Sequence, residues 1–63
     1  MNKLEEVKKL IEDKLDQLEE SINFELAKMD QEREFYNYYE KEFLIDHAIK
    51  NNLKDILEVI NNE

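Results

Sequence analysis

Residues 3–29, KLEEVKKLIEDKLDQLEESINFELAKM, decide the fold of this chain. Apolar side chains recur there at intervals of three, four and four residues, and at ~100° per residue they fall within an arc of about 100° on one helix. Arg33 takes the next place in the pattern. The spacing predicts a long amphipathic helix whose narrow apolar stripe must be buried by another helix. The predicted stripe consists of Leu4, Val7, Ile11, Leu15, Leu18, Ile22, Leu26 and Met29.

Size and composition restrict how such a helix can be stabilised. A chain of 63 residues buries only about 60% of the surface that its unfolded form exposes, so further stabilisation is common. Cysteine is absent, which excludes disulfides and thiolate metal sites, and His47 is the only histidine. We therefore expect one domain over residues 1–63, without a metal or cofactor, that is completed by homo-oligomerisation, with a dimer favoured.

The composition also indicates the fold class. Gly, Pro and Thr are absent, so turns with positive φ would need Asn or Asp, and a β-rich fold is excluded. We predict an all-α protein, a helical hairpin or bundle of coiled-coil type, with a first helix over about 3–29 that Asn2 caps. Asp30 is a candidate cap for a second helix over about 32–50, but no glycine enforces a break. One helix continuous to about Lys50 is the alternative.

Five of the six aromatic residues gather within nine positions of the second segment. On a helix they would cover, with Ile45 and Ile49, about 180° rather than 100°. Such a wide face either packs in the core between two neighbours or forms a surface for a foreign protein. The candidate partner surface consists of Phe35, Tyr36, Tyr38, Tyr39 and Phe43.

A second break is expected at Lys50-Asn51-Asn52, where one apolar pattern ends and another begins. Asn51 can take the left-handed position after a helix, and Asn52 can cap the next one with Asp55 three residues on. The sequence therefore predicts a short third helix over about 53–61 that folds back on its predecessor.

The charge balance limits the classes of partner. The chain has nine Lys and Arg residues and 17 Asp and Glu residues, which gives a net charge of −8. This charge opposes direct binding of nucleic acid and of anionic membranes. No apolar run approaches the ~20 residues of a membrane span, and no signal-peptide pattern is present. We expect a cytoplasmic protein, and the abundance of residues with AT-rich codons indicates a low-GC bacterium, or its phage or plasmid.

The residues that catalysis requires are missing. Ser21 is the only serine and stands in the middle of the first helix, 26 positions from His47. Neither residue has the loop that an oxyanion site needs. The Glu-x-x-His spacing of a di-iron helix-bundle site is also absent, because Leu44 stands three residues before His47. We therefore expect no catalytic, cofactor-binding or metal residues, and the protein is not expected to be an enzyme.

Residues 44–60, LIDHAIKNNLKDILEVI, resemble the IDEAL domain of regulatory proteins from low-GC Gram-positive bacteria. Ile45, Asp46 and Ala48 match the Ile-Asp-Glu-Ala-Leu core of that family, while His47 replaces Glu and Ile49 replaces Leu. Further along, Leu57 and Ile60 fall at the anchor positions of the short helix, with Leu57 in place of Phe, and Leu53 replaces a polar turn residue. The pattern also looks like an ankyrin helix pair. The resemblance covers 17 residues and implies a small regulatory module that contacts proteins without catalysis.

Two functions are consistent with these features. The first is a small acidic regulator or adaptor that binds and modulates a partner protein. The alternative is an acidic mimic of nucleic acid that inhibits a DNA- or RNA-binding enzyme. A purely structural coiled coil or a designed bundle is disfavoured, because designs use Ala-rich helices and glycine loops, whereas this chain has two alanines and no glycine.

Overall fold

The computed structural model describes residues 2–62, and nearly all of them are helical. Helix α1 spans Lys3–Gln31, a single 3-10 turn (η1) spans Arg33–Phe35, and helix α2 spans Tyr36–Asn61. No strand occurs within this part of the chain, which confirms the predicted all-α class.

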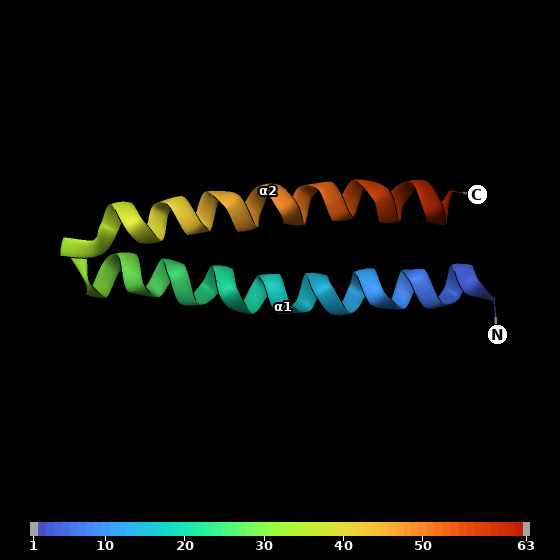
Figure 1. The fold of residues 1–63 in the computed structure, drawn as a ribbon, viewed down its shortest axis with the longest axis horizontal. Coiled ribbons are helices and arrows are strands. Elements are labelled where there is room, and N and C mark those ends of the chain that lie inside the picture. Colours follow the sequence, from blue (N-terminus) through green and yellow to red (C-terminus); the bar gives the residue numbers. More distant parts are fainter. Residues whose placement is uncertain (1, 63) are drawn as a thin grey trace.

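The two helices lie side by side and run in opposite directions, so that the start of α1 and the end of α2 meet at one end of the molecule (Figure 1). The Cα atoms extend over 48 × 17 × 12 Å. The fold is therefore a single layer of two helices, and each helix has faces that no other part of the described chain covers.

The prediction of three helices is wrong, because α2 continues through Asn51 and Asn52 without interruption. Neither asparagine has a positive φ, and neither Gly nor Pro is present to end the helix. Asn costs a helix interior only several tenths of a kcal/mol. Leu53 and Leu57 lie three and seven residues after the half-buried Lys50, so a continuous helix keeps them on the side that faces α1.

The first break occurs close to the expected place. Helix α1 ends at Gln31, and Glu32 leaves the helical region with φ −121° and ψ 72°. The Glu32 N–H still donates to the Lys28 carbonyl oxygen at 2.8 Å, and the Phe35 N–H donates to the Glu32 carbonyl oxygen at 2.9 Å. The described residues contain no positive φ, so the chain reverses direction here without a left-handed residue, and Asp30 lies inside α1 rather than capping the next helix.

Asn2 caps α1 as predicted: its side-chain oxygen accepts a hydrogen bond from the Leu4 N–H at 3.0 Å. Glu5 and Glu6 follow in the first turn. Their negative charges lie near the partial positive charge of the helix N-terminus, which favours this start of the helix.

Candidate interaction surfaces

The contact between the helices follows a different line from the predicted stripe. Apart from the half-buried Lys28, the less exposed positions of α1 and its C-cap Glu32 recur at alternating intervals of three and four residues, which is the spacing of a coiled coil. We call this set the α1 contact line; it consists of Lys8, Ile11, Leu15, Leu18, Ile22, Glu25, Met29 and Glu32.

The predicted stripe and the α1 contact line overlap only in part. Leu18 and Ile22 are buried, and Ile11, Leu15 and Met29 are half-buried. The other three residues of the predicted stripe, Leu4, Val7 and Leu26, are exposed. The stripe thus contributes to the helix pair at its centre and leaves apolar side chains uncovered at both ends.

Glu25 is the functional candidate that the sequence reasoning missed. It lies on the α1 contact line where the apolar pattern pointed to Leu26, and only 7% of its surface is exposed. The alternating spacing from Leu18 and Ile22 leads to position 25, so a coiled-coil reading of the sequence would have found it.

The surroundings of Glu25 disfavour its charged form. Burial, a side-chain hydrogen bond with Asp46, and the negative charges of Asp46 and Glu42 together raise the pKa of Glu25 from 4.5 to about 7. Its Oε1 atom is buried without a hydrogen-bond partner among the described residues. Near neutral pH, therefore, a carboxyl at the centre of the helix pair is balanced between its protonated and charged states.

The five residues of the candidate partner surface line different depressions or pack beside them. Phe35, Tyr38 and Tyr39 line one shallow depression together with Glu32. Phe43 is half-buried and stacks on His47, with 5.6 Å between ring centroids. The remaining aromatic residue, Tyr36, lines a different groove.

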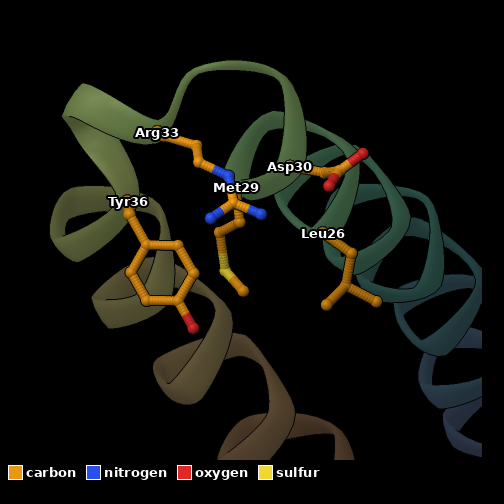
Figure 2. Close-up of a pocket in the computed structure, with 5 residues that line it drawn as sticks. All are labelled: Leu26, Met29, Asp30, Arg33 and Tyr36. Carbon is orange, nitrogen blue, oxygen red and sulfur yellow. The ribbon is translucent and has the colours of Figure 1, made fainter.

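That groove, which we call the Tyr36 groove, lies beside the turn and has a volume of about 580 Å³. Figure 2 shows Leu26 and Met29 projecting from α1 and Tyr36 from α2, on opposite sides of the groove. Asp30 and Arg33 complete the lining. The groove is therefore open and of mixed character, with apolar and aromatic side chains beside one acid and one base.

Several lysines form ion pairs with glutamates. Among the described residues, Lys28 pairs with Glu32 at 2.9 Å, and Lys50 of α2 pairs with Glu19 of α1 at 3.8 Å. The hydrogen bond and the charge of Glu32 raise the pKa of Lys28. Exposed pairs of this kind stabilise a fold little. Because each pair neutralises one lysine, the surface charge is dominated by the acidic groups that remain.

Within residues 2–62, no group of three or more His, Cys, Asp or Glu side chains is arranged to hold a metal ion. Neither described helix combines the length and the apolar character that crossing a membrane requires.

Comparisons with protein-family models, with curated proteins and with solved structures found no match for this chain.

Proposed function

We propose that the protein is a small, non-catalytic regulator or adaptor that acts by binding other protein chains. The observation that carries this proposal is the amount of apolar surface that the helix pair leaves uncovered. Leu18 and Ile22 are the buried apolar residues of the described chain, whereas large apolar side chains are exposed along both helices, from Leu4 to Val59. Such extended exposure marks interaction surfaces in soluble proteins.

The dimensions of the molecule support the same conclusion. Its accessible surface is 5127 Å², whereas a compact monomer of 7.7 kDa would expose about 4,300 Å². Its radius of gyration is 14.6 Å, against about 11 Å for a compact domain of this length. A second copy of the chain would cover part of the excess, so the proposal includes a homodimer that completes a helical bundle.

The partner protein is proposed to bind at the turn end of the molecule. The aromatic residues Phe35, Tyr36 and Tyr38 are exposed there, and the Tyr36 groove offers an open depression. Aromatic side chains beside such a depression are typical binding hot spots. The resemblance to the IDEAL domain agrees with a regulatory role, although the polar turn of that family corresponds to a helical stretch in α2.

Sedimentation velocity and affinity capture test the proposal together. The wild-type chain should sediment as a dimer, and immobilised chain should retain a host protein in stoichiometric amount. Tyr36→Ser should abolish retention without changing the sedimentation coefficient, because Tyr36 lines the Tyr36 groove. Leu10→Ser, which alters an exposed apolar residue near the other end of α1, is the matched control and should retain the same protein. A stable monomer that captures nothing would refute the proposal.

The charge supports a second candidate function, inhibition of a nucleic-acid-binding enzyme by an acidic surface. The net charge is −8, and Lys8, Lys28 and Lys50 are each engaged by a glutamate. Such an inhibitor would bind a basic enzyme in competition with DNA, and its affinity would fall steeply with salt. An affinity that is equal at low and high salt would exclude this function.

A further inference from the structure

Helix α2 carries two parallel lines of residues with coiled-coil spacing. The first line, the inner stripe, is half-buried against α1 and consists of Tyr39, Phe43, Asp46, Lys50, Leu53, Leu57 and Ile60. The second line, the outer stripe, precedes it by one residue at each position and consists of Tyr38, Glu42, Ile45, Ile49, Asn52, Ile56 and Val59. Both lines alternate steps of four and three residues, so each has the periodicity of a helix-packing seam.

Apart from the half-buried Glu42, the outer stripe is left open by the chain itself. Its five apolar side chains are between 40% and 64% exposed. One residue corresponds to about 100° of helix rotation, so the outer stripe faces about a quarter-turn away from the inner one. A helix of a four-helix bundle contacts its two neighbours in about these directions. Helix α1 is the first neighbour, and the direction of the outer stripe is open to a second one.

We propose that the outer stripe packs against the outer stripe of a second copy of the chain, with the two α2 helices antiparallel. This inference rests on the self-association in the proposed function and specifies its surface and register. The register pairs Ile45 with Ile49 of the second copy around the two-fold axis. Moving outwards, it pairs Tyr38 with Ile56 of the second copy.

Polar residues also match in this register. Glu42 meets Asn52 of the second copy, whose amide N–H groups can donate to the carboxylate. Lys41 lies beside the stripe, close to Asp55 of the second copy, and the two-fold axis generates this ion pair twice. Opposite charges at flanking positions set the orientation of paired helices.

The polar residues of the stripe do not match in the parallel arrangement. A parallel, in-register pair would bring Glu42 against Glu42 of the second copy. Burying two like charges without a counter-charge is strongly unfavourable. Charge and apolar pattern together therefore select the antiparallel pairing.

Disulfide cross-linking tests the register, because the chain has no cysteine of its own. The Tyr38→Cys and Ile56→Cys variants are mixed and oxidised mildly, and the products are separated under denaturing, non-reducing conditions. The mixture should yield mainly the disulfide-linked heterodimer. Replacing Ile56→Cys by Leu44→Cys gives the matched control, since Leu44 is equally apolar and exposed but lies outside the outer stripe. That mixture should give at most background cross-linking.

A second variant keeps the test independent of disulfide geometry. Ile49→Asp places a charge at the two-fold axis and should weaken self-association at least about tenfold in sedimentation equilibrium. Leu10→Asp, at an exposed position of α1, should leave it unchanged.

The outcomes separate this inference from the proposed function. Homodimers of each cysteine variant in place of the heterodimer would establish the parallel arrangement and overturn the inference. A wild-type dimer that neither cross-links between these positions nor dissociates with Ile49→Asp would place the interface elsewhere and leave self-association intact. A wild-type monomer would overturn this inference, whereas capture of a host protein by that monomer would leave the proposed regulatory function standing.

Discussion

At the scale of single residues, Glu25 is the position where the sequence pattern and the fold disagree most. An acidic side chain takes a place on the α1 contact line that an apolar residue would fill more favourably. It faces Asp46 and Glu42 of α2, and neither supplies a positive charge. Burying a carboxylate under these conditions is costly, so the helix pair is more stable when Glu25 carries a proton.

Stability should therefore depend on pH in a defined direction. Because the pKa of Glu25 is raised from 4.5 to about 7 in the folded state, the native state binds more protons than the unfolded state between these values. The free energy of unfolding should fall by about 2 to 3 kcal/mol as the pH rises from about 5 to about 8. Urea unfolding followed by circular dichroism at a series of pH values measures this slope.

Glu25→Gln should flatten that dependence, since glutamine keeps the shape and stays neutral. The variant should be more stable than the wild type at pH 8 and nearly equal at pH 5. Glu20→Gln, at an exposed position of the same helix, is the control and should keep the wild-type slope. Parallel slopes for Glu25→Gln and the wild type would contradict this role of Glu25.

Asn2 gives a second prediction at the residue scale. Asn2→Ala removes the acceptor of the Leu4 N–H bond and should cost about 1 kcal/mol. Hydrogen exchange should then accelerate for the amides of the first turn of α1 more than for those near its centre. Asn2→Asp retains an acceptor and adds a favourable charge at the helix N-terminus, so it should preserve protection. Equal exchange in all three proteins would show that Asn2 does not cap the helix in solution.

At the scale of helices, the sequence is informative about their existence and less so about their ends and faces. The spacing from Ile11 to Ile22 identifies the central packing face of α1, because steps of four, three and four residues are common to the predicted stripe and to the α1 contact line. Beyond Ile22 the two diverge. An antiparallel partner follows the 3.5-residue period of a coiled coil, and this period leads to Glu25 rather than to Leu26.

The aromatic segment shows what local pattern cannot provide. Its residues were expected to form one wide face on a helix, and Phe35 lies instead in the 3-10 turn that precedes the start of α2 at Tyr36. Within α2 the rings keep the angular separations that their spacing sets, ~100° per residue, and the way the helix is turned toward α1 decides which depression each ring lines. Because the break lacks glycine and proline, the sequence could not place that start.

Asn51 allows a direct test of the uninterrupted α2. In a helix interior, Asn51→Ala should stabilise the protein by about 0.5 kcal/mol, because alanine has the higher helix propensity. In the left-handed turn that the sequence suggested, the same change would destabilise it by about 1 kcal/mol or more. Asn23→Ala, within α1 and equally exposed, is the matched control. Thermal unfolding that shifts upwards for Asn23→Ala but downwards for Asn51→Ala would contradict a continuous α2.

At the scale of the whole molecule, stability and association are expected to be inseparable. Two helices in a single layer bury few side chains completely, and an isolated pair of this kind has little to offset its conformational entropy. Binding of a second copy adds stability by mass action, so the midpoint of thermal unfolding should rise with protein concentration. A midpoint that stays constant over a hundredfold range of concentration would mean that the single chain carries its own stability.

Ile56 then distinguishes the association surface from ordinary exposed surface. In the single chain Ile56 is 48% exposed and Leu10 is 68% exposed, so both alanine variants would change the stability of a monomer only slightly. If the outer stripe is covered by a second copy, Ile56→Ala removes a buried side chain and should cost about 2 kcal/mol or more. Leu10→Ala, outside that stripe, should stay within about 0.5 kcal/mol of the wild type. Urea unfolding of both variants at one fixed concentration makes the comparison, and equal small effects would show that the outer stripe remains exposed to water.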